Sequence, residues 1–488
     1  MPNAWNRIRR AGALLAAGLA FLPAAPVNAA ATAFVAAPAS APRFDAATVE
    51  RGHYLATASD CIACHTARKG QPMAGGLLLS SPVGDIVSTN ITPSKQYGIG
   101  NYSERQFADA LRKGVRADGA PLYPAMPYTA YAVMNDADVH ALYAYFMQGV
   151  PAVEQAAGPT RLPFPMNIRA SMKVWNALFL DEAPLKPVPQ ADPQWLRGRY
   201  LAEGAAHCGT CHTPRGLLMQ EKKALNMAGS QVGSWYAPNI TSHRTAGIGG
   251  WSEAELVQYL RTGRVEGKAQ AAGSMAEAIT YSFSHLHDDD LEAIARYIKD
   301  LPPVDAGGDK AHGGSRFEQG KPGNALAGLR GASYADNVRG PHLGAQLYSA
   351  NCASCHGASG QGSADGYYPS LFHNSASVVG SNLLATILFG VDRETKDGHV
   401  FMPPFGAQAN AVNHLSDEEV AALANYVQVS YGSGAPTVKA ADVAEIRRGG
   451  PQSHLLLLAR LGMSAGLLAV VLLVLAWRRR RVAQRGNS

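Results

Sequence analysis

The chain has 488 residues, of which 47% are hydrophobic and 16% are charged, and its formal net charge is +6. Three arginines near the start and five near the end supply eight positive charges, so the part between them carries a formal charge of −2. This balance gives no indication of nucleic-acid binding. A chain of this length and of ordinary globular composition is expected to form about three domains of ~150 residues each.

Residues 1–30 have the pattern of a secretory signal peptide. Three arginines precede the apolar segment 11–26, and Val27-Asn28-Ala29 is typical of a cleavage site. We therefore expect the chain to be exported from the cytoplasm. An uncleaved membrane anchor is the alternative, although the apolar segment is short for a membrane span.

The motif Cys-x-x-Cys-His occurs three times and uses every cysteine of the chain. Two thiols at this spacing can add to the two vinyl groups of one haem, and the next residue then places its imidazole over the iron. Disulfides, zinc or a redox Cys-x-x-Cys pair explain the motif less well, because none of them requires a histidine directly after the second cysteine of each pair. The motifs therefore predict three covalent haem c groups, attached at Cys61, Cys64, Cys208, Cys211, Cys352 and Cys355 and ligated by His65, His212 and His356.

Internal repetition divides the chain into three units, each with one motif. Arg51-Gly-His-Tyr54 before the first motif matches Arg197-Gly-Arg-Tyr200 before the second, and Gly344–Tyr348 is a looser version before the third. The joins are rich in proline and glycine, as linkers are. We expect three tandem cytochrome c domains at 44–156, 190–304 and 335–435, with linkers at 157–189 and 305–334.

The fold class expected for these units is all-α. The pattern predicts helices at 104–113 and 253–262, a short linker helix at 171–180, and closing helices that begin near Asn135, Asp288 and Ser416. Ser416 and Glu419 fit a capping box. Three tyrosines recur late in the closing helices and are interpreted as packing residues: Tyr145, Tyr297 and Tyr426.

Each haem iron needs a sixth ligand, and a methionine thioether there raises the reduction potential. We expect this methionine on a loop after the motif and before the closing helix. The candidates are Met126, Met275 and Met402, of which the first and third adjoin a proline that stiffens the loop. Met73, Met219 and Met227 follow the motif too soon, and Met134 and Met147 fall in or beside a closing helix. Among the other histidines, His207, His285 and His287 are expected to make ordinary hydrogen bonds or to lie at the surface.

A second apolar segment lies near the C-terminus. Residues 461–477 are almost wholly apolar, and Leu455–Ala459 lengthen the segment enough to cross a ~30 Å hydrocarbon core. Arg478–Arg481 follow at once, which places that end in the cytoplasm by the positive-inside rule. We expect one transmembrane helix at 455–477, a basic cytoplasmic tail at 478–488, a spacer at 436–454, and haem domains on the outer side; a buried amphipathic helix is the alternative.

These motifs resemble the three-haem cytochrome c subunit of bacterial membrane-bound dehydrogenases that oxidise alcohols, aldehydes, gluconate, other sugar acids or sugars. The resemblance covers about residues 45–435 and rests on Asp60-Cys-Ile-Ala-Cys-His-Thr, Asn90-Ile-Thr-Pro, Leu122-Tyr-Pro-Ala-Met-Pro-Tyr and His207-Cys-Gly-Thr-Cys-His-Thr-Pro-Arg. It implies the iron ligand pairs His65/Met126, His212/Met275 and His356/Met402. Several members bind the membrane through amphipathic C-terminal segments, whereas this chain has a plausible full span.

The resemblance further implies electron transfer from a catalytic dehydrogenase subunit to ubiquinone at the cytoplasmic membrane, with the haem domains facing the periplasm. A small third subunit is compatible with it. The third unit looks more like those serving flavin-dependent gluconate or polyol dehydrogenases; quinoprotein alcohol and molybdopterin aldehyde dehydrogenases are alternatives. No catalytic residues and no dinucleotide-binding glycine motif are evident, so the chain is not expected to be an enzyme alone. There are two alternatives to an electron-transfer subunit of a dehydrogenase. One is a peroxidase-like haem enzyme with one open iron site, and the other is a cytochrome that feeds an oxidase directly.

Overall fold

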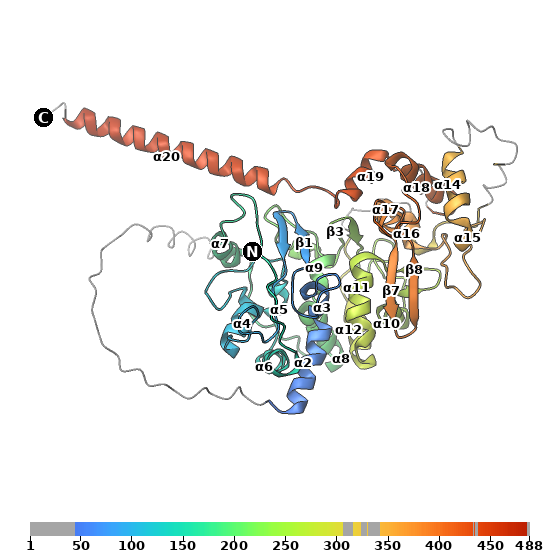
Figure 1. The fold of residues 1–488 in the computed structure, drawn as a ribbon, viewed down its shortest axis with the longest axis horizontal. Coiled ribbons are helices and arrows are strands. Elements are labelled where there is room, and N and C mark those ends of the chain that lie inside the picture. Colours follow the sequence, from blue (N-terminus) through green and yellow to red (C-terminus); the bar gives the residue numbers. More distant parts are fainter. Residues whose placement is uncertain are drawn as a thin grey trace.

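The computed structural model describes residues 44–305, 316–323, 329, 342–432, 434 and 438–485. The expected signal peptide and most of the second linker lie outside these residues. The described part is mostly helical, as expected, and also contains four antiparallel two-stranded sheets that the sequence reading did not predict. Figure 1 shows the three units in one body, from which a single long helix projects.

The elements follow the repeat. The first unit and its linker contain α2 (Ala46–Ala58), α3 (Cys61–His65), β1 (Leu78–Ser81), β2 (Gly84–Val87), α4 (Glu104–Lys113), α5 (Tyr128–Tyr131), α6 (Asp136–Ala144), η1 (Tyr145–Gly149) and α7 (Ser171–Phe179). The second contains α8 (Pro193–Tyr200), η2 (Leu201–Ala205), α9 (Cys208–His212), η3 (Lys223–Leu225), β3 (Ser230–Val232), β4 (Trp235–Ala237), α10 (Glu253–Thr262), β5 (Arg264–Val265), β6 (Ala269–Gln270), α11 (Gly273–Tyr281), η4 (Phe283–His285) and α12 (Asp288–Lys299). After η5 (Arg316–Glu318), the third contains α14 (Leu343–Asn351), α15 (Ala353–His356), α16 (Ser375–Val378), α17 (Gly380–Phe389), β7 (Val391–Thr395), β8 (Gly398–Met402), α18 (Asp417–Tyr431) and α19 (Ala440–Arg447), and α20 (Leu455–Arg485) follows.

Local capping explains where the predicted helices begin and end. Helices α4 and α10 occupy the predicted residues 104–113 and 253–262. Both start with a serine capping box and stop at a glycine in the left-handed conformation. Helix α18 starts with the expected box, in which the Ser416 hydroxyl accepts a hydrogen bond from the Glu419 backbone N–H. The linker helix α7 forms as expected.

A glycine in the first helix of each unit allows the closing helix to cross it at close range. A Cβ atom on Gly52 would lie 1.9 Å from the carbonyl oxygen of Ala141, and one on Gly198 would lie 1.8 Å from that of Ala293. Gly344 makes the same approach in the third unit. Beside these three glycines lie the Cβ atoms of Tyr145, Tyr297 and Tyr426, which confirms their predicted packing role. The repeated glycine is therefore a requirement of helix packing.

The arginine and tyrosine of the repeat join the first two units to each other. Each closing helix carries a buried carboxylate in its first turn, Asp138 in α6 and Asp290 in α12. Each carboxylate accepts hydrogen bonds from the arginine of its own unit and from the tyrosine of the other unit. The bonds are Arg51 Nε–Asp138 (2.8 Å), Tyr200 Oη–Asp138 (2.6 Å), Arg197 Nη2–Asp290 (2.7 Å) and Tyr54 Oη–Asp290 (2.6 Å). The contact between the two units is therefore reciprocal, because each unit supplies the tyrosine that bonds the buried carboxylate of the other.

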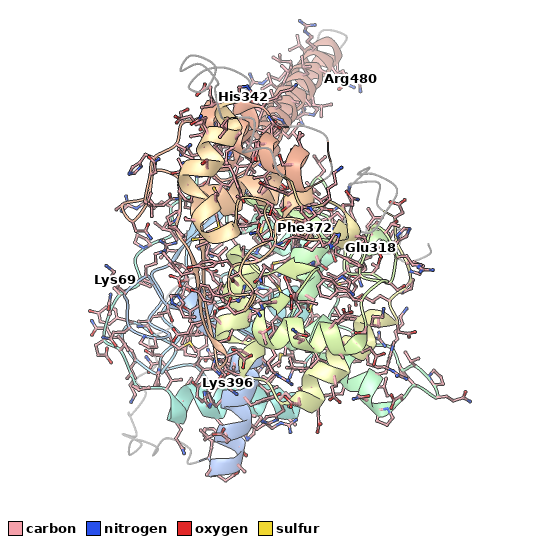
Figure 2. All side chains as sticks on the ribbon, turned by 90° about the vertical axis from the view of Figure 1, so that its right-hand side faces the viewer. Lys69, Glu318, His342, Phe372, Lys396 and Arg480 are labelled. Atoms are coloured by element: carbon pink, nitrogen blue, oxygen red, sulfur yellow. The ribbon has the colours of Figure 1, made fainter. Side chains whose placement is uncertain are left out.

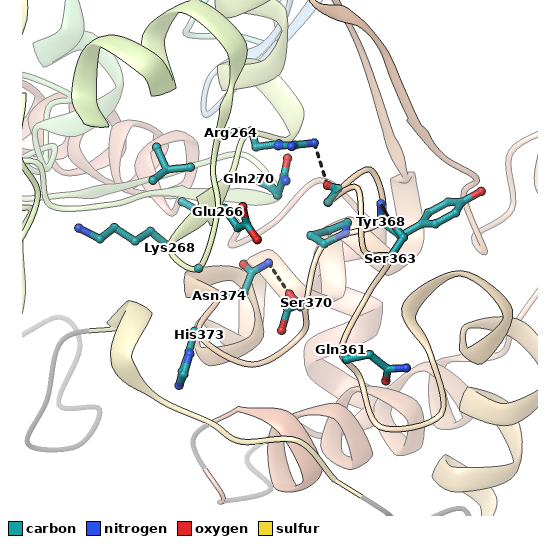
Figure 3. Close-up of a pocket in the computed structure, with 15 residues that line it drawn as sticks. Arg264, Glu266, Lys268, Gln270, Gln361, Ser363, Tyr368, Ser370, His373 and Asn374 are labelled. Carbon is teal, nitrogen blue, oxygen red and sulfur yellow. Dashed lines mark hydrogen bonds between the residues drawn. The ribbon is translucent and has the colours of Figure 1, made fainter. Parts of the chain in front are cut away.

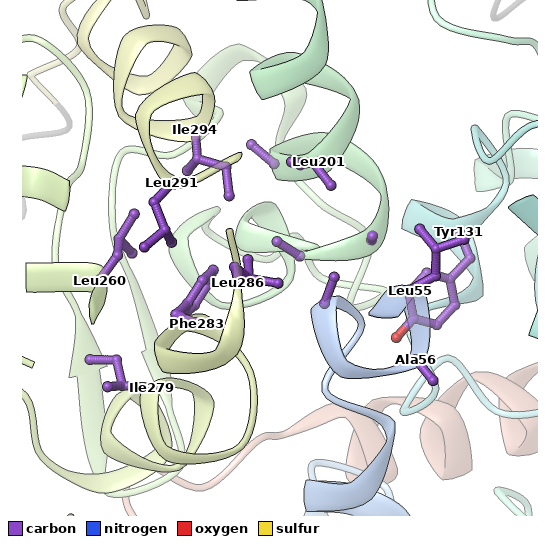
Figure 4. Packing of buried hydrophobic residues seen from close by; sticks show 14 of the residues in the cluster. Leu55, Ala56, Tyr131, Leu201, Leu260, Ile279, Phe283, Leu286, Leu291 and Ile294 are labelled. Carbon is purple, nitrogen blue, oxygen red and sulfur yellow. The ribbon is translucent and has the colours of Figure 1, made fainter. Parts of the chain in front are cut away.

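One hydrophobic core runs through both of these units, whereas the third unit has its own. Leu55 and Tyr131 of the first unit and Leu201, Phe283 and Ile294 of the second belong to one buried cluster (Figure 4). At the position of Tyr54 and Tyr200, counted from the packing glycine, the third unit has Gln346 and therefore lacks the tyrosine that joins the first two units. The first two units therefore form a pair, and the third unit docks on it.

The segment expected to be a spacer contains α19, which packs on the third unit, where Val443 and Ile446 are buried in its core. Helix α20 follows and projects from the body (Figure 1). Residues 455–482 form a helical segment that is long and apolar enough to cross a membrane. Its most apolar window of 18 residues has a mean hydropathy of 2.2 and is not buried against the rest of the chain. Near its start, Arg460 Nε donates to the Phe164 carbonyl at 3.1 Å.

Candidate haem sites

The first cysteine of each motif starts or directly precedes a short helix that ends at the motif histidine. Asp60 and His207, just before the first two motifs, have φ values of 51° and 38°, in the left-handed region. No disulfide joins any of the six cysteines. Burial raises the pKa of the Cys61, Cys208 and Cys352 thiols to about 12. Two free thiols at this spacing, followed directly by a histidine, fit thioether attachment to one haem.

All three motif histidines are held in the same way. Nδ1 of His65 donates to the Thr89 carbonyl at 2.7 Å, and Nδ1 of His212 donates to the Pro238 carbonyl at 2.7 Å. His356 makes the equivalent bond to the Pro369 carbonyl at 3.0 Å. Burial lowers the pKa of each ring, and the hydrogen bond only partly offsets this effect, so the rings are neutral. The bond fixes the tautomer in which Nε2 has a free lone pair, as an iron ligand must.

Three of the five methionines rejected as ligands lie in the protein core. Met73, Met134 and Met227 are 6%, 2% and 1% exposed. Met73 and Met227 occupy equivalent positions, since the backbone N–H of each donates to the threonine hydroxyl after the motif, at 3.2 Å to Thr66 and 3.1 Å to Thr213. These side chains therefore have a packing role.

The three candidate ligands lie elsewhere, and all are partly buried against a core cluster. Met126 lies on a loop before α5, as expected, and its carbonyl accepts a hydrogen bond from the Tyr128 backbone at 2.8 Å. Met402 ends strand β8. Met275 differs from the expectation of a loop, because it lies in the first turn of helix α11. The small residues of Gly-Ser-Met-Ala at this point allow the helix to start there.

The first two motifs lie close to each other across the joint core. Helix α3 packs against α11, the helix that carries Met275 (Figure 1). The ring of Tyr131 stacks on His207, which precedes the second motif, with centroids 5.7 Å apart. Ser282 Oγ donates to the Ala58 carbonyl at 3.3 Å, just before the first motif. The paired units thus bring two attachment sites together.

Comparison with known proteins agrees with this geometry. A cytochrome c family model matches residues 196–302 and 342–430. The cytochrome subunit of fructose dehydrogenase from Gluconobacter japonicus is 45% identical over 448 residues, which cover 90% of each chain. The chain belongs to the cytochrome c subunits of dehydrogenases.

Two further relatives have the same role by name. The cytochrome c subunit of the quinone alcohol dehydrogenase from Gluconobacter oxydans (strain 621H) is 38% identical over 427 residues, covering 83% of each chain. The cytochrome c subunit of gluconate 2-dehydrogenase from Pantoea cypripedii is 40% identical over 422 residues, covering 82% of this chain and 90% of the relative. As a member of this family the chain binds haem c covalently and transfers electrons, and catalysis belongs to a partner subunit.

Other polar side chains lie outside the three motifs. The described residues include no group of three or more His, Cys, Asp or Glu side chains placed to share a metal ion. A cleft between β5–β6 of the second unit and residues 361–374 of the third has a volume of about 60 Å³ (Figure 3). One of its walls contains Pro369, whose carbonyl holds His356.

The three spare histidines have ordinary roles in this cytochrome subunit. His207 hydrogen-bonds the Ala206 carbonyl at 2.6 Å and stacks on a tyrosine. His285 Nε2 contacts the Thr280 carbonyl at 3.0 Å. His287 stacks on Tyr54, with centroids 4.4 Å apart. The structure thus confirms the expectation that these rings pack and form hydrogen bonds.

Proposed function

We propose that this chain carries electrons from a catalytic dehydrogenase subunit through three haem c groups to ubiquinone at the cytoplasmic membrane. Haem iron supplies one-electron chemistry, because it cycles between the ferric and ferrous states. The observation that carries the proposal is the common anchoring of His65, His212 and His356, each through Nδ1 on a backbone carbonyl. Three equivalent sites in one chain form a relay.

The residues have separate tasks in this proposal. Six cysteines hold the haems, the three motif histidines and Met126, Met275 and Met402 complete the iron coordination, and the shared core fixes the first two sites relative to each other. Proline beside two of the methionines keeps their thioethers in place. A His/Met pair at each iron suits electron transfer, because a filled sixth position leaves no site for substrate.

The partner proposed is a dehydrogenase for a sugar, a sugar acid or another alcohol. The relatives serve fructose, alcohol and gluconate dehydrogenases by name. The third unit favours a flavin-dependent catalytic subunit, accompanied by a small third subunit. A quinoprotein or molybdopterin partner would use the same haem chain.

Purification of the native complex tests the relay. We expect the tagged full-length chain, extracted from its own membranes with detergent, to retain a large dehydrogenase subunit and to carry three haems. One of the substrates fructose, gluconate and ethanol should then reduce the haems, and the complex should reduce a ubiquinone analogue. The control is the double variant Cys352→Ala/Cys355→Ala, which should carry two haems. Absence of any large subunit would overturn the proposal.

The same membranes test the anchor. Because α20 is apolar along the span and is followed by arginines, we propose that it crosses the membrane with the haem units in the periplasm. A chain that ends at residue 454 should appear in the soluble periplasmic fraction with its haems, whereas the full chain should resist an alkaline wash. The matched control ends at residue 482, which removes only the last six residues and keeps the span together with Arg478–Arg481. A truncated chain that stays firmly membrane-bound would contradict this role of α20.

A further inference from the structure

Two equivalent helix ends in the first and second units are covered by different residues. Gly114 ends α4 and Gly263 ends α10, with φ values of 62° and 74°. In each unit a backbone N–H further along donates to the carbonyl of this glycine, from Leu122 at 2.7 Å and from Ala271 at 2.8 Å. The local backbone is therefore the same, and the residues that cover it can be compared directly.

In the first unit the cover comes from the unit itself. A Cβ atom on Gly114 would lie 2.6 Å from the ring of Tyr128, which is fully buried. The Tyr128 hydroxyl donates to Asn176 Oδ1 of the linker helix at 2.7 Å. Tyr128 follows the proposed ligand Met126 by two residues. The residue that covers the helix end thus belongs to the methionine loop of the same unit.

In the second unit the cover comes from the third unit. The residue two positions after Met275 is Glu277, which is exposed. Instead, a Cβ atom on Gly263 would lie 2.5 Å from Nε of Arg393 in β7. The Arg393 guanidinium donates from Nη1 to the Ala271 carbonyl at 2.6 Å and from Nη2 to Gln270 Oε1 at 3.1 Å. A charged side chain from another unit has taken the place of the tyrosine.

The hairpin that carries Arg393 touches the methionine-bearing elements of two haem sites. Strand β7 packs along α11, and the Glu394 backbone N–H donates to Thr280 Oγ1 of α11 at 3.3 Å (Figure 1). In the hairpin, Val391 pairs with Met402. Figure 2 shows Lys396, at the tip of this hairpin, far from His342 at the start of the third unit. The hairpin therefore extends from the third unit onto the second.

Arg393 is a buried cation that bonds neutral protein groups. The residue is 1% exposed, and its hydrogen bonds go to two uncharged oxygens, the Ala271 carbonyl and Gln270 Oε1. No carboxylate in the described part of the chain accepts a hydrogen bond from it. A guanidinium remains charged even when it is buried. In a low-dielectric interior such a charge disfavours the ferric iron, which carries one more positive charge than the ferrous iron.

We propose that Arg393 is a positioning residue of the second haem site, where the third unit inserts its charge beside the Met275 element and raises the reduction potential of that haem. The inference rests on the proposed function, because it requires a haem at the second motif. It assigns the third unit a second task, since docking of this unit completes the neighbouring site as well as carrying its own haem.

Spectroelectrochemical titration of the full-length chain in detergent tests this inference. In Arg393→Gln, one of the three potentials should fall, with the equilibrium constant for reducing that haem lowered about tenfold, or about 59 mV for one electron. Arg393→Lys keeps the charge but cannot reproduce both hydrogen bonds, so its potentials should stay near those of the wild type. The matched control is Arg264→Gln, which removes a partly exposed charge from the same contact between units and should change the potentials much less.

The outcomes separate charge from structure. Haem content and circular dichroism on the same samples report whether each variant folds. If Arg393→Lys and Arg393→Gln shift the potential equally, or if Arg393→Gln shifts none in a folded chain, the inference is overturned. If Arg393→Gln fails to fold, Arg393→Lys provides the test. A lowered potential in Arg393→Lys, which keeps the charge, would exclude an electrostatic effect and overturn the inference. A wild-type chain without haem at the second motif would instead overturn the proposed function.

Discussion

Met402→His should lower the reduction potential of one haem and leave the other two unchanged. The substitution replaces a thioether, which stabilises ferrous iron, with an imidazole, which stabilises ferric iron. Axial ligands tune haem potentials over a range of ~0.8 V, so the change should be the largest that a single substitution in this chain can cause. A redox titration of the purified full-length chain, followed by visible absorption, measures it. Met402 packs against the separate core of the third unit, so the substitution should not disturb the core that holds the first two sites.

The matched control for this variant is Met134→Leu. Met134 is 2% exposed in the core of the first two units and is not a proposed ligand, so its substitution should leave all three potentials near their wild-type values. Met402→Leu should remove one methionine-to-iron absorption band without adding a nitrogen ligand. An unchanged titration in Met402→His would mean that another residue ligates the third iron.

Much of each unit could be predicted from local sequence. Capping serines and terminal glycines determine α4 and α10, so these helices were predicted to the residue. The motif spacing predicts which side chains bind haem. One missed hairpin had a usable sequence signal, since Asp397 in the two-residue turn between β7 and β8 is followed by Gly398, and an Asp-Gly pair is typical of a β-hairpin connection.

The relation between the units could not be predicted in this way. The arginine and tyrosine of the repeat lie three residues apart on one helix, yet the arginine bonds its own unit and the tyrosine bonds the other. Two residues of one short pattern therefore have partners in different units, which only the packing of whole units decides. The same holds for Arg393, whose place in the chain gives no sign that it is buried in the second unit.

Asp290→Asn should destabilise the first two units together by about 3 kcal/mol at pH 7, because it removes a buried charge that accepts bonds from Arg197 and Tyr54. Burial alone would raise the pKa of Asp290, but these bonds outweigh it and hold the pKa below its usual value near 3.8. The stabilisation is therefore complete above pH 5 and is lost as the pH falls through the lowered pKa. Urea unfolding at several pH values, followed by circular dichroism, should show the difference between wild type and variant shrinking below pH 4.

Two further variants serve as comparisons for Asp290→Asn, one at an exposed ion pair and one at the equivalent carboxylate of the first unit. Glu253→Gln breaks a 3.9 Å ion pair with Arg296 in which both side chains are about half exposed, and should cost less than about 1 kcal/mol. Asp138→Asn, at the equivalent position of the first unit, should shift the same unfolding transition as Asp290→Asn, because each carboxylate also bonds a tyrosine of the other unit. Two separate transitions, each moved by only one of these variants, would show that the first two units do not share a core. Neither Asp290→Asn nor Asp138→Asn should shift the unfolding transition of the third unit, because the buried residues of that unit form a separate cluster.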